Sequence, residues 1–453
     1  MNKTTQPINL TVLPDAQATK SGRTLNYLLA YLQFHLAPNK PSEEPKVDLA
    51  AWTEYFKNNG LDIKREHRYI TAPITINLVA GEYNITTIVR VFTTADFAII
   101  GEKGGTVIRF HRYDFANEPY IWYKVFKKGR NCVAFISSYL KDPGDPDTTP
   151  ELVTKENRLI LRDMTVRMED GLWFPYKITN TQGKKEEVAV GGLLYYANFL
   201  VAEISGLDME ADGNGEVTLL DGEECDHQKI TGCRFYLDNW NDRTTGNWVL
   251  RAEQGANLNI RGDNKSALVA DNTFIKHGSD EALTFFSTGK TGKSIVSVHE
   301  NITVVRNTFT YLDSVSGETG PGTEDDDRPV HINGVLITFN ASDNVKSIWR
   351  NVLFAGNTIR LEGPVRRAVS MTVIPGDVWQ NVMFAGNHLY HTYIQNHVAP
   401  GNAAHDYWYS CSFLFQKSPD ASLLAPEGKS LGTAAATEEA STPVVYKGNV
   451  IHY

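Results

Sequence analysis

Asp280 and Glu281 are adjacent carboxylates, and their position in the sequence suits acid–base chemistry. They follow the bend-forming pair Gly278-Ser279 and come directly before an apolar segment, residues 282–285. Inverting hydrolysis of a glycosidic bond uses one carboxylic acid to protonate the leaving oxygen and one carboxylate to activate water. Neighbouring carboxylates raise one another's proton affinity, which suits the acid. The alternative is that Asp280 caps a turn and Glu281 is solvated.

The segments that would position these carboxylates share a repeated phrase, in which an apolar alternation is followed by Gly or Asn and then a β-branched or aromatic residue. Successive copies end 39, 35, 50 and 30 positions apart, at residues 230–235, 268–274, 302–309, 352–359 and 382–389. A fixed phrase at variable spacing indicates a repeated structural unit with loops of different length. Each copy is too short for a helix and its apolar period is two, so it predicts a strand.

A second apolar strand follows each copy, and together the strands predict an all-β parallel β-helix. Stacked repeats of this kind pair the backbone groups of each repeat with those of its neighbours. The Gly or Asn of the phrase suits a tight bend, because both residues tolerate left-handed backbone angles. Equivalent asparagines are expected to stack as a side-chain ladder: Asn272, Asn307, Asn357 and Asn387.

Aligning the second strands, residues 247–252, 280–285, 333–338 and 366–371, places equivalent residues in columns on one face. The first two columns contain Asn247, Asp280, Asn333 and Arg366, then Trp248, Glu281, Gly334 and Arg367. The fifth contains Arg251, Thr284, Ile337 and Ser370 and is expected to face outward. This alignment predicts an outward groove, with loops 236–245 and 314–328 as its walls. The aromatic faces of Trp173, Trp240 and Trp248 could stack against sugar rings, or could fill the cores of loops.

Three short motifs carry a resemblance to a known family. They are Ala80-Gly81-Glu82-Tyr83, then Ile100-Gly101, then Gly105-Thr106-Val107-Ile108. Together they resemble the opening of the pectate-lyase-like superfamily of right-handed parallel β-helix proteins. The resemblance implies a single-stranded right-handed β-helix over residues 71–416. Residues 1–70 would then be a small helical cap or an attachment segment, with helices near 24–36 and 47–59. Residues 417–453 would be a linker and a terminal strand that could pack on a neighbouring subunit.

A fourth motif, His277-Gly-Ser-Asp-Glu-Ala-Leu283, looks like the Gly-Asp-Asp-Cys-Ile motif of polygalacturonase-type hydrolases. On this resemblance Asp280 and Glu281 match the paired acids, and His331 loosely matches the catalytic-site histidine. The preceding repeat has Asn247 without the expected carboxylate beside it. Asp242 or Asp238 could supply that acid from the 236–245 insertion.

The rival reaction within the resembled superfamily is β-elimination of a uronic-acid polymer. It needs a base, often Arg or Lys, and a cation that neutralises the substrate carboxylate. Arg251, Arg306, Arg366 and Arg367 are candidates for these roles. Asp325, Asp326 and Asp327 lie in an acidic loop that could hold Ca²⁺, although such a run is commonly just solvated.

Composition limits the partners. The chain of 453 residues has 44 basic and 53 acidic side chains, a formal charge of −9, and no basic cluster that would favour nucleic acid. It shows no apolar run of membrane-span length and no secretory pattern at its start. Its four cysteines lack zinc-site spacing, and Cys233 is expected to be a buried free thiol.

The expected function is therefore binding and cleavage of a polysaccharide along the strand face, with hydrolysis slightly favoured over elimination. The resemblance also suggests a homotrimeric phage tailspike or depolymerase, which would be located on the virion or outside the cell. The alternative is a non-catalytic structural or receptor-binding β-helix of a virion or cell surface. An epimerase or sugar transferase on the same fold is a further possibility.

Overall fold

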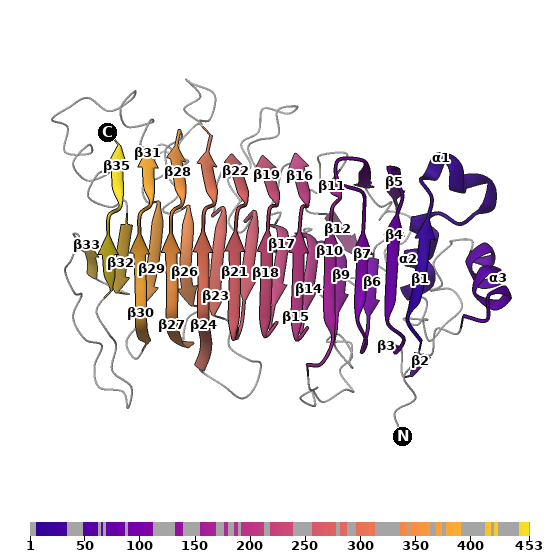
Figure 1. Cartoon of the computed structure of the whole chain (residues 1–453), viewed down its shortest axis with the longest axis horizontal. Coiled ribbons are helices and arrows are strands. Elements are labelled where there is room, and N and C mark those ends of the chain that lie inside the picture. The colour runs from indigo at the N-terminus through magenta and orange to yellow at the C-terminus, as the bar shows by residue number, and fades with distance from the viewer. Residues whose placement is uncertain are drawn as a thin grey trace. The chain divides into compact units, whose positions relative to one another are not determined.

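The computed structural model describes most of the chain as two compact units, Met1–Val217 and Thr218–Tyr453. In each unit nearly all the strands run parallel to their neighbours (Figure 1). The described residues are 6–33, 49–61, 65–66, 69–86, 89–111, 132–138, 155–168, 176–179, 185–188, 192–212, 218–238, 256–277, 281–287, 296–312, 336–341, 345–362, 368–373, 377–390, 413–417, 421–424 and 444–452.

In both units the chain visits three parallel sheets in rotation, so that each repeat adds one strand to the first, second and third sheet in turn. In the unit Thr218–Tyr453 the first sheet contains β18 (His227–Thr231), β21 (Ser266–Ala270), β24 (Val296–Val305), β27 (Lys346–Ala355), β30 (Val378–Ala385) and β34 (Val445–Lys447). The second contains β19 (Arg234–Asp238), β22 (Thr273–His277), β25 (Thr308–Tyr311), β28 (Thr358–Leu361), β31 (His388–Tyr390) and β35 (Val450–His452). The third contains β17 (Thr218–Glu223), β20 (Leu258–Arg261), β23 (Leu283–Ser287), β26 (Ile337–Ala341), β29 (Val369–Val373) and β32 (Phe413–Lys417), with β33 (Ala421–Leu424) antiparallel to β32.

The unit Met1–Val217 follows the same rotation. Its first sheet contains β1 (Ile8–Val12), β4 (Ile74–Leu78), β7 (Phe97–Ile100), β10 (Arg158–Arg162) and β15 (Val201–Ser205). Its second contains β5 (Gly81–Ile85), β8 (Thr106–Phe110), β11 (Thr165–Met168) and β16 (Asp208–Asp212), and its third β6 (Val89–Phe92), β9 (Cys132–Ser137) and β14 (Gly192–Ala197). Two antiparallel pairs complete it, β2 (Arg65–Glu66) with β3 (Tyr69–Ile70) and β12 (Tyr176–Thr179) with β13 (Lys185–Val188).

The first 70 residues contain both the expected helices and an unexpected strand. Short helical turns α1 (Asp15–Ala18) and η1 (Thr19–Ser21) precede α2 (Leu25–Gln33) and α3 (Ala50–Asn58). Helix α2 lies against β5 and β6, and its Asn26 exchanges two 3.1 Å hydrogen bonds with Thr86. Strand β1 pairs with β4, so the first sheet begins before these helices. The role of residues 1–70 as a cap or an attachment segment stays a prediction. No helix among the described residues is long and apolar enough to cross a membrane.

The repeated phrase has the predicted structure. Its apolar alternation forms a strand of the first sheet, and its closing residues begin a strand of the second sheet. The alternate side chains point inward, where Phe274 stacks on Phe235 and Phe309 at centroid distances of 5.0 and 4.6 Å. These rings are fully buried and form a continuous aromatic stack in the core.

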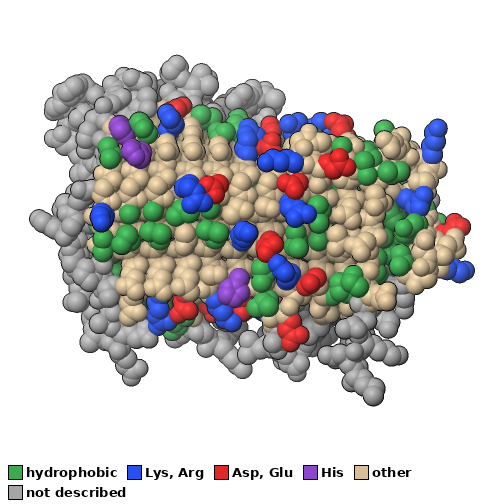
Figure 2. Space-filling view, viewed as in Figure 1, with side chains coloured by type: hydrophobic (Ala, Val, Ile, Leu, Met, Phe, Trp, Pro, Cys, Tyr) green, Lys and Arg blue, Asp and Glu red, His purple; other side chains and the backbone are tan. Residues whose placement is uncertain are grey.

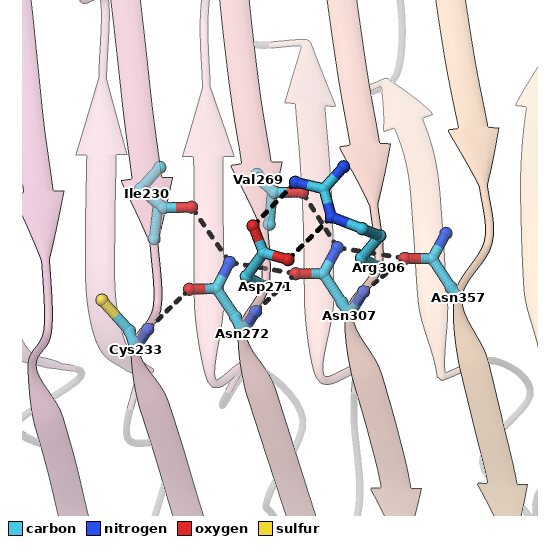
Figure 3. A network of polar contacts seen from close by, with 8 residues as sticks. All are labelled: Ile230, Cys233, Val269, Asp271, Asn272, Arg306, Asn307 and Asn357. Carbon is cyan, nitrogen blue, oxygen red and sulfur yellow. Dashed lines mark hydrogen bonds and ion pairs between the residues drawn. The ribbon is translucent and has the colours of Figure 1, made fainter.

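The bend between the first and second sheets holds the predicted asparagine ladder (Figure 3). The side-chain amide of Asn272 donates to Oδ1 of Asn307 at 3.0 Å, and that of Asn307 donates to Oδ1 of Asn357 at 3.1 Å. The ladder continues through Asn387 to Asn449 at 3.0 and 2.7 Å. Each of these asparagines is preceded by a residue with positive φ. Asparagine therefore supplies the hydrogen bonds of the bend, while the residue before it, Asp271, Arg306 or a glycine, supplies the left-handed backbone.

The ladder begins at Cys233, whose backbone N–H donates to Oδ1 of Asn272 at 2.9 Å. Cys233 is buried and free, as the sequence predicts. At the other end, β34 and β35 pair with β30 and β31 of the same unit. The terminal strand that the sequence predicts is therefore present, and its packing on a neighbouring subunit stays a prediction.

A second interior column lies at the start of the first-sheet strands. Asn264, His299, Trp349 and Trp379 occupy successive register positions. The His299 ring stacks on Trp349 with centroids 4.0 Å apart, and Nε2 lies 2.9 Å from Oγ of Ser287. The side-chain amide of Asn264 donates to Nδ1, which leaves the proton of the neutral ring on Nε2. Burial lowers the pKa of His299 to about 3, with partial opposition from the charge of Asp263.

This depressed pKa predicts a pH-dependent loss of stability. Unfolded His299 binds a proton below its ordinary pKa of 6.5, whereas the folded protein does not until about 3. The contribution of His299 to the free energy of unfolding is therefore complete above pH 6.5. It falls as pH decreases from 6.5 to about 3, by up to about 1.4 kcal/mol per pH unit. We expect His299→Phe, which keeps a stacked ring without a titrating nitrogen, to remove this slope. The free energy of unfolding of the wild type and of His299→Phe, measured between pH 7 and pH 4, tests this prediction. Equal slopes against pH in the two proteins would show that His299 does not cause the pH dependence.

Candidate functional site

The third sheet of the unit Thr218–Tyr453 has an outer face with a row of polar side chains. Leu283 pairs in register with Leu258 and Ile337, and Phe285 stacks on Phe339 at 5.1 Å inside the sheet. Because side chains of a strand alternate between faces, the residues next to these point outward. The outer row, as we define it, consists of Asp221, Asn259, Thr284 and Thr338, which are register partners in sequence order.

This register corrects two predictions of the column alignment. The strand beside β23 is β20, Leu258–Arg261, and not the predicted strand 247–252, whose residues lie outside the described ones. Ile337, predicted to face outward, is fully buried and pairs with Leu283, and Thr338 takes the outward position. The physical reason lies at the corner before β26. Leu336 is buried there and accepts a hydrogen bond from N–H of Ala282 at 2.7 Å, so the alternation starts one residue later.

Glu281 is the predicted catalytic residue that the structure describes. It is half-buried and lies just before Ala282 and β23, at the corner between the second and third sheets. Burial raises the pKa of Glu281, and its own backbone N–H, the charge of Lys276 and the hydroxyl of Thr338 oppose the rise. A carboxyl group in this environment keeps its proton at a higher pH than a solvated one, which is the property that a general acid needs.

Lys276 lies on β22 and is fully buried, although lysine is almost never buried without a partner. It precedes Glu281 by five residues across the corner. Asn257 holds the corner together, because its side-chain amide donates to the carbonyls of Phe235 at 3.1 Å and Ile275 at 2.9 Å. These bonds connect Asn257, which directly precedes β20, to β19 and to β22, the strand that carries Lys276.

The outer row combines one ion pair with neutral groups. Arg261 pairs with Asp221, which is 4% exposed, and Asn259 donates to Oγ1 of Thr218 at 3.4 Å. The hydroxyl of Thr284 is buried and makes no hydrogen bond within the part of the chain that the structure describes. Most buried hydroxyls are hydrogen-bonded, so that of Thr284 can take a partner from outside the described residues, such as a water or a ligand group.

The remaining predicted site residues lie outside the described residues. They are Asp280, His331, Asp242, Arg251 and Arg367 among the catalytic candidates, Trp240, Trp248, Asn247, Asn333, Arg366 and Trp173 among the substrate-binding ones, and Asp325, Asp326 and Asp327 for Ca²⁺. Within the described ranges, no three His, Cys, Asp or Glu side chains are grouped so that they could hold a metal ion.

Arg306 is not part of this face, contrary to its prediction as a cation of the groove. It lies at the ladder bend between the first and second sheets, where its guanidinium pairs with both oxygens of Asp271 at 2.8 and 2.7 Å (Figure 3). On the face of the molecule shown in Figure 2, described acidic and basic side chains likewise lie beside one another, and neither sign forms an extended patch.

Sequence reasoning missed Asp221, Asn259, Arg261, Lys276 and Thr338. A signal existed for two of them, because Leu258-Asn-Ile-Arg261 alternates apolar and polar residues as a strand does. The buried position of Lys276 had no such signal, since a lysine at a strand end is usually solvated.

Comparison of the chain with protein-family models, with curated proteins and with solved structures found no match.

Proposed function

We propose that this chain is a right-handed parallel β-helix that binds and hydrolyses a polysaccharide along the outer face of its third sheet. The support for the architecture is the rotation through three parallel sheets, with the ladder of asparagines at one bend of successive repeats. This arrangement agrees with the resemblance to the pectate-lyase-like superfamily. The resemblance alone supports the extension to a homotrimeric tailspike or depolymerase outside the cell.

The observation that carries the proposed reaction is the environment of Glu281. A half-buried carboxyl group with a raised pKa, beside a row of polar side chains, suits protonation of a glycosidic oxygen. Asp280, the preceding residue in the sequence, is the candidate for the carboxylate that activates water. Hydrolysis is favoured over elimination, because Glu281 suits the role of the acid, whereas Arg306, one of the four arginines predicted as the base or cation of a lyase, lies elsewhere.

The test is a time course of the purified full chain on plant, algal and bacterial capsular polysaccharides. Reducing ends and ultraviolet absorbance are followed together, because elimination forms an absorbing double bond and hydrolysis does not. We expect new reducing ends without absorbance. A parallel rise in absorbance would identify a lyase, and binding without either signal would identify the non-catalytic, receptor-binding alternative.

The pH dependence of hydrolysis provides a separate prediction. If Glu281 is the acid, activity falls as pH rises through its pKa, which burial raises above its usual range. The positive charge of Lys276 opposes this rise, so Lys276→Met is expected to move the alkaline limb to higher pH. Initial rates across pH 4 to 9 measure the limb in both proteins. Lys265→Met is the control, because Lys265 pairs with Asp226 at the surface. If Lys276→Met left the alkaline limb of the pH profile unchanged, the role of Glu281 as the acid would be contradicted.

A further inference from the structure

The charge of the third-sheet outer face indicates the class of its ligand. Its described carboxylates are Asp221, Glu223 and Glu281, and its described cations are Arg261 and Lys276, of which Lys276 is fully buried beside Glu281. Arg261 is already paired with Asp221. A polymer that carries a carboxylate on each sugar would therefore meet no exposed, unpaired cation among these described residues, so its charges would lose water here without gaining a partner.

The groups between these charges are neutral hydrogen-bonding side chains. Asn259, Thr284 and Thr338 occupy neighbouring strands at the same register position, so they follow one another at the spacing of adjacent strands, about 4.8 Å. Thr284 is 8% exposed, and its hydroxyl lacks a hydrogen-bond partner among the described residues. Hydroxyl and amide groups bind sugar hydroxyls as both donors and acceptors, without the charge that a uronate requires.

From these two observations we infer that the outer row binds an uncharged polysaccharide. In the free protein the hydroxyl of Thr284 is bonded to a water, and in the complex a sugar hydroxyl takes the place of that water. This inference rests on the proposed function, because it concerns the same face and names its substrate class. It distinguishes the site from one built for a polyuronate, whose carboxylates would need unpaired cations along the row.

Binding can be measured separately from cleavage. The full chain carrying Glu281→Gln is run by affinity electrophoresis in gels that contain neutral polymers (galactomannan, xyloglucan, dextran) or polyuronates (polygalacturonate, alginate). We expect retardation by a neutral polymer, no retardation by either polyuronate, and little change between 50 and 500 mM salt. Adding Thr284→Val should weaken the retardation about tenfold, the effect of one lost hydrogen bond of about 1.4 kcal/mol. Thr284→Ser should restore it, and Thr303→Val, on the first sheet, should leave it unchanged.

The outcomes separate this inference from the proposed reaction. Retardation by a polyuronate that salt abolishes would overturn the inference, even if the wild type hydrolyses that polymer. Retardation by a neutral polymer that the wild type does not cleave would support the inference and refute the proposed hydrolysis. Equal retardation of Thr284→Val and the parent, or no retardation by any of the five polymers, would also overturn the inference.

Discussion

Replacing Glu281 with Gln is expected to lower the rate of polysaccharide hydrolysis by a factor of about 10² to 10⁴, the usual contribution of a general acid. The same substitution should raise the stability of the fold at neutral pH. Burial raises the pKa of Glu281 in the folded protein. The contribution of Glu281 to the free energy of unfolding is therefore complete below the pKa of the unfolded state, and it is lost as pH rises through the pKa of the folded state. Glutamine keeps the size of the side chain and has no charge to bury. Initial rates of reducing-end formation and thermal unfolding at pH 7 and pH 4 measure the two effects.

Glu300→Gln is the matched control. Glu300 lies on β24 in the first sheet and pairs with Arg350 at 2.7 Å, so its replacement should change the rate little. A surface ion pair contributes at most about 1 kcal/mol, and its loss should slightly lower the stability. If Glu281→Gln retained full activity, the role of Glu281 as the acid would be wrong. If it lost activity and was less stable at pH 7, the loss would be a structural effect.

Replacing Asn307 with Ala is expected to lower the free energy of unfolding of the unit Thr218–Tyr453 by about 3 kcal/mol. Oδ1 of Asn307 accepts from the backbone and side chain of Asn272, and its amide donates to Val269 and Asn357. Asn307 is 1% exposed, so its removal leaves several buried groups without partners, each costing about 1–3 kcal/mol before relaxation. Urea unfolding of the full chain measures the change.

Asn351→Gly is the control for the ladder prediction. Asn351 also donates to an asparagine of one neighbouring repeat and accepts from that of another, Asn301 and Asn381, both at 3.0 Å. This second row is exposed, and Asn351 has a φ of 55°, which glycine adopts without strain. We expect a loss below about 1 kcal/mol, since water replaces the exposed bonds. Equal losses in Asn351→Gly and Asn307→Ala would show that burial of the ladder does not determine its contribution.

The sequence predicted the part of the fold that local pattern determines. The apolar alternation identified the strands of the first sheet, and the asparagine ladder followed from the equivalence of Asn272, Asn307, Asn357 and Asn387. Both features recur in the successive copies of the phrase from residue 268 onward. Strand β1 was missed because it stands alone, separated from its partner β4 by the helices.

The third sheet was predicted less accurately, because its strands follow connections of different length. Without a fixed distance from the phrase, the alignment chose residues 247–252 rather than Leu258–Arg261 and placed Ile337 outward. A shift of one residue exchanges the two faces of a strand, so this error changed which side chains form the outer row. Glu281 was identified from its chemistry alone, whereas its burial depends on the corner that Ala282, Leu336 and Lys276 form.

Two of the three corners of each repeat differ in how far their length varies. In the unit Thr218–Tyr453, two residues join the first sheet to the second in all six described bends, whereas the connection from the second sheet to the third varies from His277–Leu283, the shortest, to Tyr311–Ile337, the longest. The asparagine ladder fixes the register of neighbouring repeats at the short bend between the first and second sheets. The length of the connection between the second and third sheets can therefore change without shifting the strands. Doubling a loop adds only about 0.6 kcal/mol of closure entropy. The connection between the second and third sheets can therefore be replaced by sequences of widely different length, while the register of the strands is kept.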